Sequence, residues 1–156
     1  MELVIFVGLQ ASGKTSFYRA RFAQTHELVS KDRMPNNRNP TRRQLVLVEE
    51  ALRAGRPVVV DNTNARAADR LPLVVLGHAL GARVVAYYFE SRVEDCLERN
   101  RMRSGKARVP DVALYATRKR LEAPSYAEGF DALYFVRMDA GGWEVAEWGD
   151  DSAACV

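Results

Sequence analysis

The sequence predicts an α/β fold of three layers, in which a mainly parallel sheet of five strands is flanked by helices on both faces. Short apolar runs rich in β-branched residues alternate with segments of helical periodicity, as expected for strands buried on both faces. The first apolar run, 2–7, leads directly into the stretch Gly8-Leu-Gln-Ala-Ser-Gly-Lys-Thr15. A helical segment follows that stretch at once, so strand, loop and helix have the order of a parallel α/β unit.

Residues 8–15 match the pattern G-x-x-x-x-G-K-[ST] at every fixed position. In such a loop the backbone N–H groups point at the oxygens of a triphosphate such as ATP, the lysine reaches its β/γ end and the hydroxyl residue binds Mg²⁺. The alternative, a glycine turn with a solvated lysine, is disfavoured by the strand before the loop and the helix predicted for 16–24. We therefore expect a P-loop NTPase or kinase fold with these nucleotide-binding residues: Gly8, Gln10, Ala11, Ser12, Gly13, Lys14, Thr15 and Ser16.

The size and composition fit one globular domain over residues 1–156, with 47% hydrophobic and 28% charged residues. The net charge of +3 suggests only an affinity for anions, but only Lys14, Lys31, Lys106 and Lys119 are lysines among 23 basic residues. Arginine, which dominates, suits bidentate contacts to phosphate, although a compositional bias would also explain its excess.

The two cysteines, Cys96 and Cys155, are too few for a disulfide framework and lack metal-ligand spacing. The first strand begins without a charged and apolar leader, and no apolar run approaches membrane-spanning length. We expect a soluble cytoplasmic protein that does not bind membranes.

The second predicted strand, 26–30, is followed by Asp32, at the end of a strand where open α/β sheets bind ligands. A turn-forming or capping aspartate is the alternative. Residues 34–40 are rich in turn formers, and a helix is predicted from 41 to 54, with Gly55 as its end. Arg38, Arg42 and Arg43 lie near its start. They form either an anion-binding site or a cluster of solvated surface charges.

The third predicted strand, 56–61, ends in an acid, Asp61, followed by Asn62-Thr63-Asn64. An acid after a hydrophobic strand in a P-loop protein commonly reaches Mg²⁺, so Asp61 joins Thr15 as a metal candidate. Residues 65–81 are predicted to be mainly helical, interrupted or started late by Pro72.

After a fourth predicted strand, 83–89, a helix is predicted for 91–103, with Ser91 and Glu94 as a capping box and Cys96 in its buried face. Arg99 and Arg103 would share one helix face. Basic residues continue through the segment 99–110, which has the composition of a hinged lid that brings arginines to a polyphosphate. A solvated surface is the alternative.

The remaining segments are a predicted helix at 111–123 and a fifth strand at 130–137. Alternating Trp143 and Val145 would form a short edge strand, and we expect 150–156 to fray.

Together, GLQASGKT, Asp32, the string Asp61-Asn-Thr-Asn64 and Arg99-Asn-x-x-Arg103 followed by Lys-x-x-Val-Pro resemble the kinase domain of 5′-OH polynucleotide kinases over about residues 1–133. The resemblance implies transfer of phosphate from ATP, with Mg²⁺, to the 5′ hydroxyl of DNA or RNA. It implies that Lys14 contacts phosphate, Thr15 binds Mg²⁺, Asp32 takes the proton of the hydroxyl, Arg103 is the essential lid arginine and Arg99 supports it.

One departure from the family pattern concerns the acceptor. The family places an acceptor-binding arginine three residues after the catalytic aspartate, and here that position is Pro35. We assign acceptor binding, through backbone phosphates of DNA or RNA ends, to Arg33, Arg38, Arg42, Arg43, Asn62, Thr63 and Asn64. Two alternatives stay open: a small-molecule kinase for a sugar, nucleoside or antibiotic, and a nucleotide-binding switch or ATPase without an acceptor. Donor preference and oligomeric state are also open.

Overall fold

The computed structural model describes residues 1–139 and 141–149, and within them six strands form one sheet in the order β2-β3-β1-β4-β5-β6. Five of the strands are parallel: β1 (Glu2–Val7), β2 (Glu27–Val29), β3 (Val58–Asp61), β4 (Arg83–Phe89) and β5 (Ala132–Asp139). β6 (Gly142–Glu147) runs antiparallel to β5 and contains both residues of the expected edge strand. The α/β prediction is confirmed, with six strands in place of five; the expected fraying of 150–156 lies outside the described residues.

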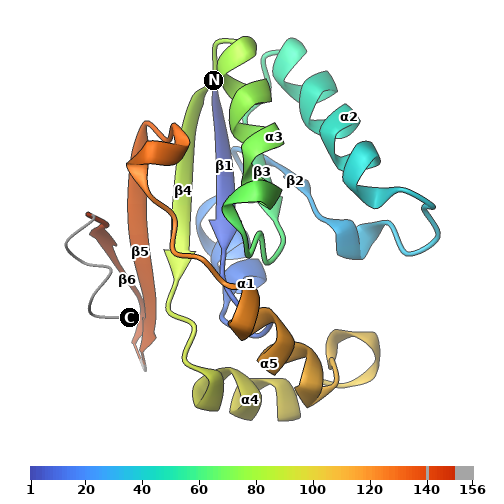
Figure 1. The fold of residues 1–156 in the computed structure, drawn as a ribbon, viewed down its shortest axis with the longest axis vertical. Coiled ribbons are helices and arrows are strands. Elements are labelled where there is room, and N and C mark those ends of the chain that lie inside the picture. The colour runs from blue at the N-terminus through green and yellow to red at the C-terminus, as the bar shows by residue number, and fades with distance from the viewer. Residues whose placement is uncertain (140, 150–156) are drawn as a thin grey trace.

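Five α-helices accompany the sheet (Figure 1): α1 (Lys14–Arg21), α2 (Pro40–Arg53), α3 (Ala67–Ala79), α4 (Val93–Arg101) and α5 (Asp111–Arg120). Single 3₁₀ turns occupy Lys31–Arg33, Gly105–Ala107 and Tyr126–Glu128. α1 lies behind the strands of Figure 1 and α3 in front of them, while α4 and α5 contact each other beyond the carboxyl end of β4. No described helix has the length and apolar character needed to span a bilayer.

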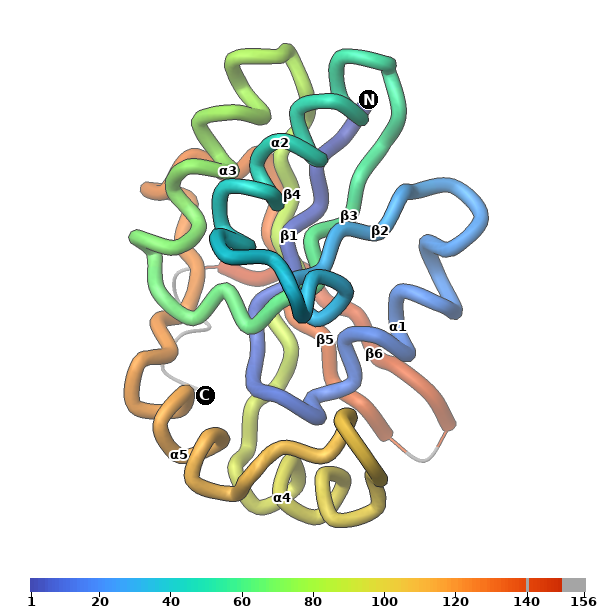
Figure 2. The backbone as a smooth tube through the Cα atoms, turned by 90° about the vertical axis from the view of Figure 1, so that its right-hand side faces the viewer, coloured from blue at the N-terminus to red at the C-terminus, as the bar shows by residue number. Residues whose placement is uncertain are grey.

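Alternating residues of β1 pack into two different core clusters, one on each face of the sheet. Leu3, Ile5 and Val7 join the cluster that includes residues of α2 and α3. Val4 and Phe6 join the other, which is rich in aromatic rings of α1 and β4. Figure 2 shows the layers from the side, with α3 and α1 on opposite sides of the strands. A strand covered on both faces needs apolar residues at every position, which explains the unbroken apolar run.

Three local predictions were wrong, each for a physical reason. Pro72 lies inside α3 and does not interrupt it; Pro72 and Ala68 are exposed, so water can bond the carbonyl that the proline leaves without a donor. Ser91 does not cap α4, because its hydroxyl is buried and bonded elsewhere. α4 ends at Arg101, so Arg103 lies beyond it and does not share a helix face with Arg99.

The parallel register brings the carboxyl ends of β1 to β5 to the same end of the sheet. The loop after β1, Asp32 after β2, Asp61 at the end of β3 and Met138 near the end of β5 therefore lie at one end of the molecule. In open parallel sheets this end is where ligands bind.

Candidate active site

The loop between β1 and α1 is anchored to two neighbouring strands. Its first residue, Gly8, donates its N–H to the Thr63 carbonyl at 3.1 Å, after β3. Leu9 donates its N–H to the buried Ser91 hydroxyl at 3.1 Å, after β4. Gly13, at φ 98°, precedes the first turn of α1, and a Cβ at Gly13 would collide with the sulfur of Met138. Only glycine fits this position, because both the φ angle and the strand β5 exclude a side chain.

Lys14 lies inside the loop. Its ammonium donates to the carbonyls of Gly8 at 3.0 Å and Leu9 at 2.5 Å, and it lies 3.4 Å from the Ser12 hydroxyl. Burial lowers the pKa of Lys14 to about 8, against the raising effect of the Asp61 charge. A triphosphate would supply the negative charge that this ammonium lacks in the loop.

Thr15 and Asp61 form the oxygen pair expected for magnesium. The Thr15 hydroxyl donates to Asp61 Oδ2 at 2.8 Å. Burial raises the pKa of Asp61, while Lys14 and the Thr15 hydroxyl counteract it. A hydroxyl and a carboxylate are ligands that Mg²⁺ accepts, either directly or through water, so the residues fit the ion. The described residues hold no cluster of three or more His, Cys, Asp or Glu side chains suited to a metal.

Asp32 and Arg103 come from two different segments, the 3₁₀ turn after β2 and the chain after α4. Asp32 is exposed in the 3₁₀ turn after β2, where its N–H donates to the Ser30 hydroxyl at 3.3 Å. Arg103 is half-buried and donates to the Ala107 carbonyl at 3.3 Å. The charges of both residues act on the pKa values of Lys14 and Asp61. The structure therefore brings Lys14, Asp61, Asp32 and Arg103 into one electrostatic environment.

Arg99 contacts the loop itself. From the last turn of α4, its Nη1 donates to the Ala11 carbonyl at 2.8 Å. Gln10, two positions after Gly8, donates to the Thr117 hydroxyl of α5 at 3.1 Å. α4 and α5, the helices before and after the segment 102–110, therefore both contact the loop.

The expected acceptor residues divide into two groups. The Asn62 amide accepts from the Lys31 N–H at 2.9 Å and donates to Gln44, and the buried Asn64 donates to the Phe6 carbonyl at 2.7 Å. These bonds order the loop after β3, and Thr63 is half-buried within it. The other group consists of exposed side chains on the 3₁₀ turn, the segment after it and α2: Arg33, Arg38, Arg42 and Arg43.

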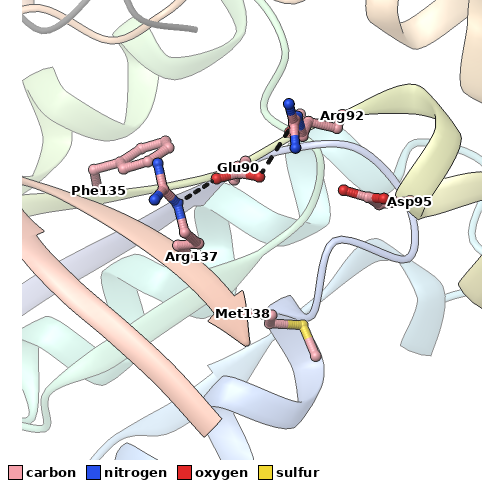
Figure 3. Close-up of a pocket in the computed structure, with 7 residues that line it drawn as sticks. Glu90, Arg92, Asp95, Phe135, Arg137 and Met138 are labelled. Atoms are coloured by element: carbon pink, nitrogen blue, oxygen red, sulfur yellow. Dashed lines mark hydrogen bonds and ion pairs between the residues drawn. The ribbon is translucent and has the colours of Figure 1, made fainter. Parts of the chain in front are cut away.

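A cavity of about 610 Å³ opens beside the loop, between the carboxyl ends of β4 and β5 and the start of α4. Figure 3 shows Glu90 between Arg137 and Arg92, with its carboxylate 2.7 Å and 3.9 Å from their guanidinium groups. Met138, which lies against Gly13, and Ser91, which binds Leu9, also line it. Two residues that line the cavity thus contact the phosphate-binding loop.

Sequence reasoning missed four polar residues that build the site. Gln44 lies on the apolar face of α2, in line with Val48 and Leu52, and a polar residue in that stripe was the available signal. Asn100 is fully buried, and its amide bonds both the N–H and the carbonyl of Val109. The sequence analysis placed Ser91 in a capping box and Asn100 in the motif Arg99-Asn-x-x-Arg103, but no local pattern indicates that either side chain is buried.

Arg70 is the fourth polar residue that sequence reasoning missed. Its fully buried guanidinium donates twice to Glu128, at 2.8 and 2.9 Å, and to the carbonyls of Asn64, Ala65 and Glu122. It joins the loop after β3 to the segment after α5. An arginine in a helix is ordinarily exposed, so its burial required the structure.

The fold and the loop together define the class: this chain is a P-loop domain with a kinase-like fold. Within that class it belongs to the AAA domain family, whose model matches residues 3–124.

Solved structures share the fold. A gluconokinase from Sinorhizobium meliloti 1021 is 19% identical at a TM-score of 0.63, over 87% of this chain and 82% of that one. Chaetomium thermophilum Kti12 in complex with ADP-AlF3 is 18% identical at a TM-score of 0.68, over 89% of this chain and 92% of that one. A chain of the Pnkp1/Rnl/Hen1 complex is 22% identical at 0.54, over 63% of this chain and 38% of that one. At these identities the similarity establishes the fold.

Proposed function

We propose that this protein is an ATP-dependent polynucleotide 5′-hydroxyl kinase, which transfers the γ-phosphate to the 5′-OH end of DNA or RNA. The observation that carries the proposal is the group of charges around the loop: the charges of Asp32, after β2, and Arg103, after α4, both act on Lys14 and Asp61. A phosphate donor, a proton acceptor and a mobile cation are the parts that phosphoryl transfer needs.

The donor would bind with its phosphates in the loop and its nucleoside in the cavity beside it. Lys14 would leave the loop carbonyls for the β/γ end of the triphosphate. Thr15 and Asp61 would hold Mg²⁺, which neutralises charge on the β and γ oxygens when bound. The cavity is large enough for a nucleoside and is lined by charged and apolar side chains.

Asp32 would accept the proton of the attacking hydroxyl. The acceptor oxygen bonds to the γ-phosphorus, the bond from phosphorus to the β-γ bridging oxygen breaks, and ADP leaves. Lys14 and Arg103 would neutralise charge on the transferred group, and an arginine in this role contributes on the order of 10³ to 10⁵ in rate. For this role Asp32 needs to come within hydrogen-bond reach of the attacking hydroxyl.

The exposed arginines at positions 33, 38, 42 and 43 support a polynucleotide as the acceptor. They follow Asp32 along the turn and the start of α2. Guanidinium groups in such an arrangement suit consecutive backbone phosphates, with little dependence on base sequence. Thr63 and Asn62, on the neighbouring loop, would approach the terminal nucleotide.

A small-molecule kinase is the second candidate, and one observation favours it. Pro35 occupies the position at which the resembled family has its acceptor-binding arginine. Without that contact, the same donor site would serve equally well for a sugar or a nucleoside as the acceptor.

The test is phosphate incorporation from γ-labelled ATP into 5′-OH DNA and RNA oligonucleotides, with gluconate and a nucleoside in parallel. We expect labelled oligonucleotide from the parent protein, about a thousandfold less from Arg103→Ala, and unchanged labelling from Arg53→Ala, an exposed arginine elsewhere on α2. Asp32→Asn should lose most turnover and keep ATP affinity.

Label in the small molecule alone would assign the second candidate. ATP hydrolysis that is independent of any acceptor would identify an ATPase or switch. A loss of ATP affinity in Asp32→Asn would give that residue a metal-binding or structural role.

A further inference from the structure

Ala11 holds the phosphate-binding loop in a conformation that alanine disfavours. Its φ is 61°, and among the described residues only Asn64 is another non-glycine with a positive φ. A Cβ in the left-handed region crowds the following carbonyl, so Ala11 would return to a negative φ without support. The residue is 3% exposed. The loop therefore needs contacts from outside itself to keep this shape.

Both ends of the peptide unit between Ala11 and Ser12 are held. Arg99 Nη1 donates to the Ala11 carbonyl at 2.8 Å, from 88 residues further along the chain. On the other side of the same peptide unit, the Ser12 N–H donates to the Leu9 carbonyl at 3.3 Å. With both groups bonded, the peptide plane cannot turn over. Its orientation sets the direction of the next amides, which face the phosphates.

The anchor of Arg99 is rigid. Within α4, Cys96 and Leu97 are buried in a cluster with Leu9 of the loop, and Asn100 is fully buried one residue after Arg99. Arg99 itself is half-buried, and its bond to the loop is charge-assisted. The packing of α4 thus fixes the base of the Arg99 side chain, and the bond to Ala11 holds its guanidinium.

We propose that Arg99 is a positioning residue, which keeps the Ala11–Ser12 peptide in its left-handed arrangement so that the loop amides face a nucleotide before it binds. The inference rests on the proposed binding of nucleotide by this loop. It differs from the role implied by the polynucleotide kinase resemblance, in which Arg99 supports the lid arginine at the substrate.

A double-mutant cycle tests the inference, because glycine adopts the left-handed region without strain and removes the need for support. ADP affinity is measured by calorimetry for the parent, Arg99→Ala, Ala11→Gly and the double variant. We expect Arg99→Ala to weaken ADP binding about tenfold in the parent and less than about twofold in the Ala11→Gly background. Glu98→Ala, at an exposed neighbouring position on α4, is the control and should bind ADP as the parent does.

Amide hydrogen exchange of the nucleotide-free proteins provides a second test of the inference. The Ser12 and Gly13 amides should exchange faster in Arg99→Ala and return to the parent rate in the double variant. Arg99→Lys, which keeps a donor, replaces Arg99→Ala in the cycle if the alanine variant does not fold.

An equal loss of ADP affinity in both backgrounds, or unchanged exchange at Ser12 and Gly13, would overturn the inference. Since neither measurement involves an acceptor, a failure of the proposed kinase activity would leave this result interpretable on its own.

Discussion

Lys14 carries its charge at a position where burial makes the charge costly. Lys14 is 8% exposed, and its ammonium is bonded to neutral groups of its own loop. Its pKa of about 8 lies well below the usual value for lysine. The same desolvation that lowers this pKa leaves the ammonium with unsatisfied attraction for an anion, so phosphate should bind to it strongly.

Nucleotide affinity should therefore depend on pH above about 8. Below that value Lys14 is protonated in both the free and the bound protein, and affinity is constant. Bound phosphate favours the charged form and raises the pKa, so at higher pH binding must take up a proton. Affinity should then fall by up to about tenfold per pH unit until the pKa of the complex is reached.

Calorimetry in buffers of different ionisation enthalpy measures this proton uptake directly. Lys14→Met should bind more weakly and show no such dependence. Proton uptake that persists in Lys14→Met would assign the titration to another group.

At the scale of elements, the segment 99–110, which the sequence predicts to be a lid, is closed at its base by one side chain. The Asn100 amide donates to the Val109 carbonyl at 2.7 Å and accepts from the Val109 N–H at 3.0 Å. These two bonds close a loop of eight residues, 101–108, that contains Arg103 and the 3₁₀ turn Gly105–Ala107. The loop would move as one unit about this closure, not as an open chain.

Asn100→Ala should loosen the segment, because both polar groups of Val109 would lose their partner inside the protein. We expect a decrease of about 2 kcal/mol in the free energy of unfolding. Phosphate transfer should decrease more than nucleotide binding, since Arg103 would lose its defined position. Denaturant unfolding and transfer assays measure the two effects; Ser104→Ala, at an exposed position in the same loop, is the control.

The sequence predicts the elements well wherever apolar pattern and chain order determine them. The phosphate-binding loop, the parallel strands and the acids after β2 and β3 follow from short runs whose context is local. The end of α4 was misplaced because the buried Asn100 diverts the chain back to Val109, and no local pattern records a contact made nine residues away. The sequence predicts that Ser91 caps a helix, yet its hydroxyl accepts the N–H of Leu9, which lies 82 residues earlier in the chain. Long-range polar contacts are what the sequence leaves unspecified.

At the scale of the whole molecule, exposed arginines at the two ends of the sheet have different surroundings. At the amino ends of the strands, Arg53, Arg56 and Arg83 each form an ion pair with a glutamate. Within residues 1–139 and 141–149, no such pair is formed by Arg38, Arg42 or Arg43. The molecule thus has unneutralised positive charge on the side of Asp32.

Binding of a 5′-OH oligonucleotide should therefore weaken as salt rises. Replacing Arg38, Arg42 and Arg43 together by alanine should reduce the slope of log affinity against log salt by about 2 for a single strand. The matched triple replacement of Arg53, Arg56 and Arg83 should leave the slope unchanged. Fluorescence anisotropy across a salt series measures both, and equal slopes in the two variants would contradict a polynucleotide path along α2.

The contact between Met138 and Gly13 makes nucleotide binding sensitive to oxidants. Conversion of the thioether to a sulfoxide adds a polar oxygen at the sulfur that lies against the loop glycine. Hydrogen peroxide should weaken ADP binding in the parent and in Met102→Leu, whose methionine is 85% exposed, but not in Met138→Leu. Peroxide damage and its enzymatic repair would then act on this protein through the last parallel strand of the sheet, while the buried Cys96 thiol stays protected.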